Sequence, residues 1–321
     1  MENTTDMEMA TIDEDKTFFA EIRHDDKLSG DSAVAQVAIL YTSVSGVRRL
    51  RILNLCLPVC NDYTQMYRVA DHETIVTFLF KNAVELNREK GNREMREAIA
   101  ARCAKILAAY REKCSVQSPL GQLILPESLK LLPLLVNSII KHDALSGGSE
   151  MMVDEKCWMI ELIRSLPIEA AMRLLYPRVH TVNDVPSEGD SPPPIVRASI
   201  DFFQNDKVYV VDNAIALFLW IGSEVPSQWV NDVFGVPSFA QINSEKHEIP
   251  EKDNPESRRL RKIIESVEGV IRQKKIFIVK EKDTTEIWMK KFLVEDKTGP
   301  NSMSYVDFLC YIHREVRNIL S

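Results

Sequence analysis

The chain has 321 residues, which is enough for about two or three domains, each with a core of its own. Hydrophobic residues make up 45% and charged residues 27% of the sequence, and this ordinary composition excludes collagen-like, low-complexity and wholly disordered classes. The formal net charge is −7, but residues 1–15 alone hold six acidic residues and no lysine or arginine. The nearly neutral remainder argues against nucleic-acid binding, which requires clustered cations.

The lack of a recognisable targeting signal and the small number of cysteines indicate a cytoplasmic protein. No apolar run is long enough to cross a membrane, and the acidic N-terminus lacks the basic and apolar regions of a signal peptide. Six cysteines are too few for a disulfide framework in a chain of this length, which fits a reducing compartment. Cys56 and Cys60 have no second pair at ligand spacing, so we expect no zinc site there. We expect small apolar thiols within helices at four other positions, Cys103, Cys114, Cys157 and Cys310.

The part at 17–60 shows the alternation of apolar and polar residues that is typical of β-strands. We expect three strands separated by glycine-containing turns, at 18–23, 33–41 and 47–57. The second and third of these form a hairpin. Because three strands alone leave one apolar face uncovered and their edges unpaired, we expect them to complete a larger sheet whose other strands lie outside this sequence.

Helical periodicity replaces this alternation after residue 61. Apolar stripes predict four helices that bury against one another, at 75–86, 95–110, 129–141 and 154–166. The third is interrupted by Pro133, and Asp154 is the expected N-cap of the fourth. The sequence therefore predicts an all-α unit that ends at about Tyr176.

A stretch rich in proline, glycine, serine and acidic residues follows at 185–194 and is typical of a linker or long loop. Beyond it we expect strands at 207–211, 214–221 and 275–280, and helices at 256–272, 286–292 and 305–320. This alternation predicts a compact α/β or α+β domain. The last helix has an apolar stripe of its own, and our hypothesis is that it docks on the helical domain.

The sequence contains no recognisable catalytic motif. Neither phosphate-binding pattern, G-x-x-x-x-G-K-[ST] or G-x-G-x-x-G, occurs, and there is no G-x-S-x-G nucleophile elbow. His72-Glu73 begins like a zinc-protease motif but lacks the second histidine. His24-Asp25-Asp26 falls at an expected turn, where Asx side chains cap backbone groups more often than they bind metals. We therefore expect a protein that is not an enzyme.

A basic helix is the first candidate contact site. The helix expected at 256–272 carries Arg258, Arg259 and Arg261. These residues form either a basic contact surface for anionic lipid headgroups or an ordinary solvated face. The membrane signal is weak because this helix has no tryptophan or phenylalanine on an apolar face.

Tryptophan residues give the second candidate. Trp158 and Trp220 lie in apolar stripes, so we expect both in the core. Trp288 lies between Glu286 and Lys290 in a helix of mixed character. It marks either a peptide-binding groove or a position packed in a core or at a domain junction.

Eight sequence stretches occur in an order that is more specific than any one of them: His24-Asp-Asp-Lys-Leu28, Val37-Ala-Ile-Leu-Tyr-Thr-Ser43, Arg48-Arg-Leu-Arg-Ile-Leu-Asn-Leu55, Gln122-Leu-Ile-Leu-Pro-Glu-Ser-Leu-Lys130, Leu217-Phe-Leu-Trp-Ile-Gly222, Val236-Pro-Ser-Phe-Ala-Gln-Ile-Asn243, Phe292-Leu-Val-Glu-Asp-Lys297 and Ser304-Tyr-Val-Asp-Phe-Leu309. In this order they resemble the C-terminal part of the cargo-adaptor subunit of the COPII inner coat, the Sec twenty-four type. The partner subunit of the Sec twenty-three type shares the general architecture, but the sixth and seventh stretches resemble the adaptor.

The resemblance implies a multidomain α+β fold. Its expected parts are an acidic tail or linker at 1–16, the C-terminal strands of a β-barrel or sandwich at 17–60, an all-α helical domain at 61–177, a gelsolin-like α/β domain at 178–300 and a C-terminal helix at 301–321.

The resemblance also implies a non-enzymatic coat component that recruits membrane cargo, through export signals, for transport from the endoplasmic reticulum to the Golgi. Its implied partners are the Sec twenty-three type subunit, a Sar-type GTPase and the outer coat. Such a protein is cytoplasmic and peripheral to the endoplasmic reticulum membrane, at exit sites and on COPII vesicles. No cofactor is expected in these residues, because the zinc of the family belongs to an upstream segment. Trp288 resembles an aromatic residue near the family's C-terminal cargo surface.

Two alternatives stay open at this point. One is a coat element that stimulates GTP hydrolysis through an inserted arginine. The other is an actin- or calcium-binding gelsolin-like module, for which Glu295-Asp296 offers candidate oxygen ligands.

Overall fold

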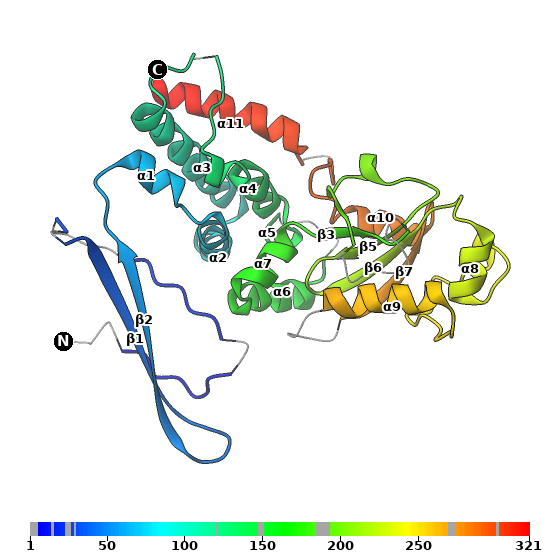
Figure 1. The fold of residues 1–321 in the computed structure, drawn as a ribbon. Helices are drawn as coiled ribbons and strands as arrows, with labels where there is room; N and C mark the ends of the chain where they lie inside the picture. Colours follow the sequence, from blue (N-terminus) through cyan, green and yellow to red (C-terminus); the bar gives the residue numbers. More distant parts are fainter. Residues whose placement is uncertain are drawn as a thin grey trace.

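The computed structural model describes a chain with a protruding hairpin, a helical unit and a five-stranded sheet unit (Figure 1). The residues that it describes are 6–13, 16–22, 27–28, 30–119, 121–146, 151–183, 193–268, 274–299 and 302–321. The triplet at 24–26 and most of the expected linker at 185–194 lie outside this description.

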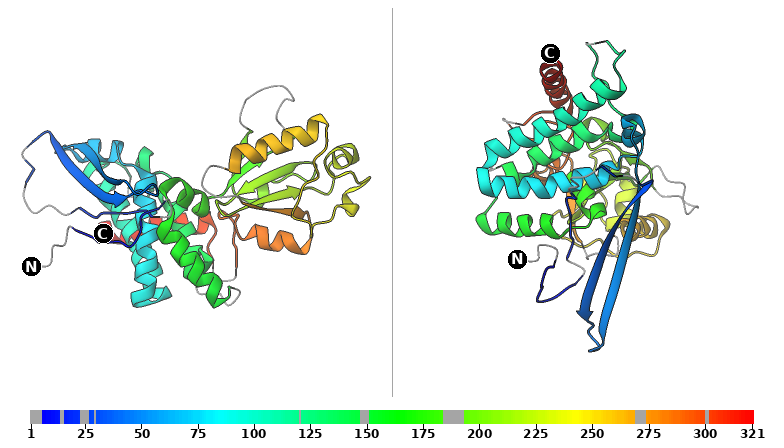
Figure 2. Two further views of the ribbon diagram at one scale, coloured as in Figure 1. Left: turned by 90° about the horizontal axis from the view of Figure 1, so that it is seen from below. Right: turned by 90° about the vertical axis from the view of Figure 1, so that its left-hand side faces the viewer.

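The hairpin consists of β1 (Ser32–Thr42) and β2 (Arg48–Pro58), which pair antiparallel with Ala38 opposite Ile52. Its turn includes Gly46 at a φ of +82°, a left-handed conformation that glycine adopts without strain. Residues of β2 are exposed on both faces, and the hairpin extends away from the rest of the molecule (Figures 1 and 2). The predicted hairpin is confirmed.

The strand expected at 18–23 is wrong for the residues described, 18–22. This segment makes side-chain contacts with the helical unit and has no strand pairing: the Thr17 hydroxyl donates to the Ser165 carbonyl at 2.6 Å, and the Lys81 ammonium lies 5.0 Å from the Phe19 ring centroid. Alternation in sequence does not make a strand where no neighbouring strand supplies backbone partners.

The helical unit contains α1 (Tyr63–Arg68), α2 (His72–Lys90), α3 (Asn92–Cys114), the short 3₁₀ helix η1 (Glu127–Leu129), α4 (Leu132–Lys141), α5 (Asp143–Ser146), α6 (Val153–Ser165) and α7 (Ile168–Leu175). Asp62 and Asp71 accept from backbone N–H groups as the N-caps of α1 and α2. Gly91, at a φ of +85°, separates α2 from α3. The apolar stripes of α2 and α3 form one core with α4 and α7.

Two details of the expected helices are wrong. Pro133 does not interrupt a helix at 129–141, because α4 begins at Leu132 and proline is tolerated in the first turn, where its missing N–H has no partner to lose. Asp154 is not an N-cap, because α6 begins at Val153; Glu155 instead accepts from the Met152 backbone N–H at 3.1 Å.

The sheet has the strand order β4-β3-β5-β6-β7. Its strands are β3 (Arg178–Thr181), β4 (Ile195–Val196), β5 (Val208–Asp212), β6 (Ala216–Ile221) and β7 (Lys275–Lys280), and every pair is antiparallel except β6 with β7. The helices α8 (Ser227–Phe234) and α9 (Pro255–Glu268) pack on one face. The helix α10 (Thr284–Lys290) packs on the other face, as Figure 2 shows. The sheet therefore has a core on each side.

The last helix, α11 (Tyr305–Leu320), returns to the helical unit (Figure 1). It packs on α3 and α4, and its Phe308, Ile312 and Val316 are buried in the helical core. The hypothesis that this helix docks on the helical domain is confirmed. None of the helices described combines the length and apolar character that a membrane-spanning helix needs.

Buried polar contacts join the helical unit to the sheet unit. Asp212, at the end of β5, is fully buried and accepts from Arg173 of α7 at 3.1 Å and from the ammonium of Lys274 at 2.7 Å. Lys141, at the end of α4, donates to the carbonyls of Val294 at 2.8 Å and Asp296 at 2.6 Å. The two units are thus fixed to each other by directed hydrogen bonds.

Candidate functional site

A pocket of about 360 Å³ lies where the helical unit meets the α10 face of the sheet. Its lining is largely apolar and comes from segments far apart in the sequence. The sheet unit contributes Phe218, Phe277, Trp288 and Phe292, and the helical unit contributes His142, Met151, Trp158, Met159 and Leu174. A largely apolar pocket with a few polar groups at its edge is typical of a ligand-binding site.

The sheet-side wall is a cluster of aromatic rings. Phe218 of β6 and Phe277 of β7 lie opposite each other in the parallel pair, and their rings stack with centroids 5.5 Å apart. Trp288 of α10 meets both rings edge to face, at 5.0 Å from Phe218 and 4.8 Å from Phe277. Because its neighbours fix the ring and 41% of the residue is still exposed, Trp288 presents a rigid apolar surface.

The opposite wall includes Trp158 of α6, which is 50% exposed. The expectation that Trp158 is a core residue is therefore wrong, whereas Trp220, only 2% exposed, is confirmed as core. On α6, Leu162 and Ile163 are buried, whereas Trp158, one turn before Leu162, is exposed and lines the pocket. An apolar stripe on a helix shows that a face is apolar but does not show whether protein covers it.

Two basic residues at the end of α4, Lys141 and His142, are partly buried in the wall of the pocket. Burial lowers the pKa of Lys141 to about 8, partly opposed by the carboxylate of Asp296. Burial also lowers the pKa of His142 to about 4, so its imidazole is neutral at physiological pH. The His142 ring lies 5.2 Å from the Phe80 ring, and its Nδ1 has no hydrogen-bond partner within the described part of the chain.

The edge of the pocket carries both signs of charge. Lys275 lies with its ammonium 5.1 Å from the Phe277 ring centroid, and Lys291 follows α10. Asp143 and Glu155 lie on the helical side. An extended peptide with apolar side chains would find apolar walls here and charged groups at the edge.

The three arginines of α9 lie on the opposite face of the sheet from Trp288. Arg258 is exposed and pairs with Asp253 at 2.8 Å. Arg261 donates to the Lys252 carbonyl at 3.1 Å. The Arg259 side chain is only 15% exposed, and two of its nitrogens have no partner among the described residues. The structure brings none of the three near the pocket and directs one of them inward.

The candidate calcium ligands are engaged in other contacts. Glu295 pairs with Arg197 and accepts from the Tyr176 hydroxyl at 2.7 Å. Asp296 accepts from the Ile200 backbone N–H at 2.8 Å. Cys56 and Cys60 are exposed free thiols. Within the described ranges, no group of three or more His, Cys, Asp or Glu residues is arranged to hold a metal ion.

Comparison with known proteins decides the family. Three family models match the chain: the Sec23/Sec24 beta-sandwich domain at 1–60, the Sec23/Sec24 helical domain at 71–173 and the gelsolin repeat at 189–264. Human Sec24C, a protein transport protein, is 40% identical over 323 residues, with 100% of this chain and 30% of the relative aligned. The chain belongs to the Sec23/Sec24 family.

Within this family the chain is of the Sec24 type. Human Sec24D is 36% identical, with 100% of this chain and 31% of the relative aligned, and Arabidopsis thaliana SEC24 B is 32% identical, with 99% and 29% aligned. The crystal structure of the human COPII-coat protein Sec24c matches with a TM-score of 0.88 at 38% identity, covering 93% of this chain and 40% of that one. The chain thus spans about 30% of the length of these curated relatives.

These findings confirm the resemblance to the C-terminal part of a Sec24-type subunit and the multidomain α+β fold class, with β-sandwich, helical and gelsolin-like parts. They give no support to a GTPase-stimulating element or to an actin- or calcium-binding module. The domain boundaries, Trp288 as a peptide contact and the basic surface of α9 stay predictions.

The helical wall of the pocket was not anticipated. His142 and Trp158 meet the sheet side only because α4 and α6 lie against it. The sequence signal for this wall is the apolar stripe of α6 that contains Trp158. The sequence alone does not distinguish an exposed apolar stripe from a buried one.

Proposed function

We propose that this chain is the C-terminal part of a non-enzymatic COPII cargo adaptor that recruits membrane cargo for transport from the endoplasmic reticulum to the Golgi. The support is its membership of the Sec24 type, whose members are named protein transport proteins and one of which is titled a COPII-coat protein. The sequence motifs of nucleotide and hydrolase chemistry are missing from it, which agrees with a binding role.

The proposal includes the setting in which the adaptor works. Its partners would be a Sec23-type subunit, a Sar-type GTPase and the outer coat, and it would act in the cytoplasm, peripheral to the endoplasmic reticulum membrane at exit sites and on COPII vesicles. No cofactor is proposed within these residues, and the zinc of the family is assigned to an upstream segment. Family membership supports the partners and the location.

We assign the cargo contact in these residues to the pocket that Trp288 lines. The observation that carries this assignment is the partly exposed Trp288 ring, which three other aromatic side chains hold in place. Rigid aromatic residues in a concave site are typical anchors of peptide interfaces, since they bury large apolar area with little loss of conformational entropy. Trp158 on the opposite wall would enclose an apolar side chain of an export signal.

A selection experiment tests this assignment. A display library of short random peptides is selected on the wild-type chain, and the enriched peptides are then titrated against Trp288→Ala. We expect the enriched peptides to share bulky apolar residues and to lose about ten-fold or more in affinity for the variant, the effect of removing an aromatic anchor. Ile287→Ala is the matched control, because Ile287 is 68% exposed on the same helix and does not line the pocket. Equal binding by wild type and Trp288→Ala would overturn the assignment.

A further inference from the structure

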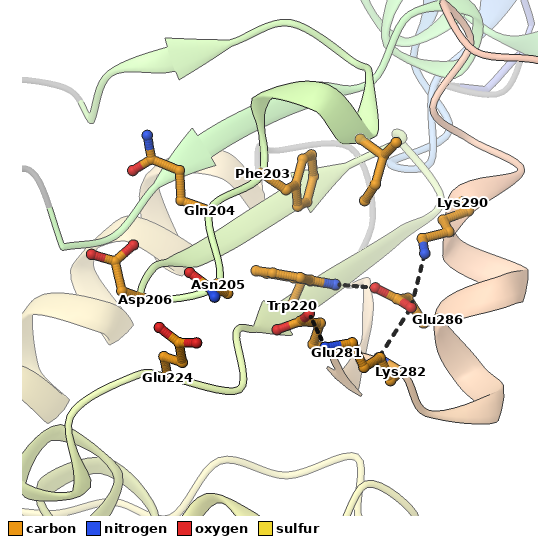
Figure 3. Close-up of a pocket in the computed structure, with 11 residues that line it drawn as sticks. Phe203, Gln204, Asn205, Asp206, Trp220, Glu224, Glu281, Lys282, Glu286 and Lys290 are labelled. Atoms are coloured by element: carbon orange, nitrogen blue, oxygen red, sulfur yellow. Dashed lines mark hydrogen bonds and ion pairs between the residues drawn. The ribbon is translucent and has the colours of Figure 1, made fainter.

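A second pocket, of about 570 Å³, lies on the other side of α10 and within the sheet unit alone (Figure 3). The loop before β5 contributes Phe203 and Asp206, β6 contributes Trp220, and the loop after β6 contributes Glu224. The far end is formed by the loop after β7 and by α10. Neither the family resemblance nor the proposed cargo contact assigns a role to this pocket.

Four carboxylates and two ammonium groups line it, and two of the carboxylates are fully engaged. Glu286 is buried and accepts from the Trp220 indole N–H at 3.0 Å, the Lys282 backbone N–H at 3.1 Å and the Lys290 ammonium at 2.9 Å. Glu281 accepts from Ser223 through both its backbone N–H and its hydroxyl, and it pairs with the Lys282 ammonium at 3.1 Å. At this end of the pocket the charges cancel.

The remaining two carboxylates are available to a ligand. Within the described ranges, the side chains of Asp206 and Glu224 have no hydrogen-bond or ion-pair partner. Figure 3 shows both at one end of the pocket, on the side of Trp220 away from Glu286 and Lys290. The pocket therefore has a net negative charge, and that charge is concentrated at one end.

An aromatic ring, Phe203, lines another side of the pocket (Figure 3). The half-buried Phe203 ring meets the Trp220 ring at right angles with centroids 5.2 Å apart, and it meets Tyr209 at 4.5 Å. Phe203 is thus held by two buried rings and cannot swing away without losing both contacts. A pocket lined by a rigid ring as well as by carboxylates favours an organic cation over an anion.

The two loops that carry the free carboxylates are fastened to each other. The Glu224 backbone N–H donates to the Asn205 carbonyl at 2.8 Å, and the Gly222 N–H donates to the Lys207 carbonyl at 3.0 Å. A Cβ at Gly222 would collide with the Asn205 backbone, so only glycine allows this approach. The backbone positions of Asp206 and Glu224 are therefore fixed before any ligand binds, so only their side chains have to be ordered on binding.

We propose that this pocket binds an arginine side chain of a partner protein, with the guanidinium between Asp206 and Glu224. Arginine fits better than lysine, because its planar fork can donate to two carboxylates at once. Charge complementarity selects the partner: the free groups of the pocket are both anionic, so an acidic segment is repelled and a basic one attracted.

This site does not depend on the cargo pocket around Trp288. Figure 3 shows Glu286 and Lys290 on the side of α10 that faces Trp220, whereas Trp288 of the same helix lines the other pocket. An arginine-containing segment bound here would leave the cargo pocket open. One chain could then hold an apolar peptide and a basic peptide at the same time.

The test uses the full chain, with the four indole N–H signals resolved by heteronuclear NMR and assigned by Trp→Phe variants. The probe is the blocked peptide acetyl-Gly-Arg-Gly-amide, compared with its lysine form and with its citrulline form, which keeps the shape and loses the charge. We expect the arginine peptide to shift the Trp220 signal saturably, with a Kd of about 1 mM, and to leave the Trp288 signal in place. The lysine form should bind more weakly, and the citrulline form should not bind.

Matched variants decide the outcome. Asp206→Asn with Glu224→Gln should weaken arginine binding about ten-fold or more, since both charge-assisted hydrogen bonds lose their charge. Glu248→Gln with Glu251→Gln removes the same charge at exposed positions outside the pocket and should leave binding unchanged. Spermidine, a flexible polyamine without a planar cation, tests whether a free amine is the ligand instead of a protein side chain. It should bind less well than the arginine peptide. No saturable shift up to about 10 mM peptide, an equal shift with citrulline, or undiminished binding by the first double variant would overturn the proposal.

Discussion

The two pockets share the helix α10 but differ in how they are built. The cargo pocket around Trp288 is mainly apolar and takes its walls from both the helical unit and the sheet unit. The arginine pocket around Trp220 is polar and lies within the sheet unit alone. The shape of the first therefore depends on how the two units are held together, whereas the shape of the second depends only on loops next to the sheet.

Buried charged groups are among the contacts that hold the units together. Asp212 receives Arg173 from the helical side and Lys274 from the sheet side, and all three are largely buried. Such a group stabilises the structure only while it is complete, because the loss of one member leaves another charge buried without compensation. Removing Asp212 should consequently damage the cargo pocket more than the arginine pocket.

The largest effect is expected for Asp212→Asn. The amide cannot neutralise the ammonium of Lys274, which is 7% exposed, so we expect the free energy of unfolding to fall by about 3 kcal/mol. Urea denaturation measures this change, and indole NMR should show the Trp288 signal moving more than that of Trp220. Asp253→Asn, which breaks the exposed pair with Arg258, should change stability by less than about 0.5 kcal/mol. A loss below about 1 kcal/mol for Asp212→Asn would contradict this account of the junction.

Gly222→Ala should damage the arginine pocket more than the cargo pocket. The added methyl group meets the Asn205 backbone, which cannot move without separating the two loops of the arginine pocket, so we expect a loss of about 2–3 kcal/mol. Here the Trp220 indole signal should shift and that of Trp288 should not. Gly299→Ala has no heavy atom within 4 Å of the new Cβ and is the control, with an expected change below about 0.5 kcal/mol. If both alanine variants are equally stable, the loops do not need this close approach.

The cargo pocket should respond to pH through His142. The pKa of His142 is about 4 in the folded chain, whereas the ordinary value for histidine is 6.5. Between pH 4 and pH 6.5 the imidazole is therefore protonated in the unfolded chain and neutral in the folded chain. The free energy of unfolding should therefore fall as the pH drops from about 6.5 to about 4, by about 2 kcal/mol from this residue. Urea midpoints at neutral pH and at about pH 4.5, for wild type and His142→Gln, isolate its share. Parallel loss in both proteins would assign the pH dependence to other groups, such as His180, whose pKa burial also lowers.

The smallest effect concerns one strained residue beside each pocket. Ala214, in the turn before β6, has a φ of +70°, and Lys282, which lines the arginine pocket, has a φ of +64°. Ala214→Gly should raise stability by about 0.5 kcal/mol, since relief of backbone strain outweighs the entropy of glycine. Lys282→Gly should gain nothing, because it also loses the ion pair with Glu281. Thermal unfolding of both variants measures the difference, and an equal gain would show that this ion pair is neutral.

Local patterns predicted much of the fold because several elements carry their own signals. The strand at 275–280 and the helix at 305–320 have the bounds expected, and the hairpin follows from alternation with a glycine turn. Four short helices, α1, α5, α7 and α8, were missed, since none has more than eight residues and each has too few turns for a clear period.

The candidate sites were predictable only in part. Trp288 stands out in sequence because it interrupts a charged helix, and the structure places it in a pocket wall. The other wall depends on docking through Asp212 and Lys141, two charged residues that sequence rules place at the surface. The arginine pocket was not foreseen, because Asp206 and Glu224 are ordinary acidic residues until the loops that carry them come together.

The return of α11 to the helical unit has a consequence for synthesis of the protein. Helices α3 and α4 emerge from the ribosome before the sheet, and α11, which completes their core, emerges after it. Until then the apolar positions that receive Phe308 and Ile312 face water, the kind of surface that chaperones bind. The ribosome synthesises the sheet unit between these helices and α11. The helical unit therefore begins to emerge before the sheet unit and is completed after it, and a nascent chain halted before residue 305 would expose an unfinished helical core.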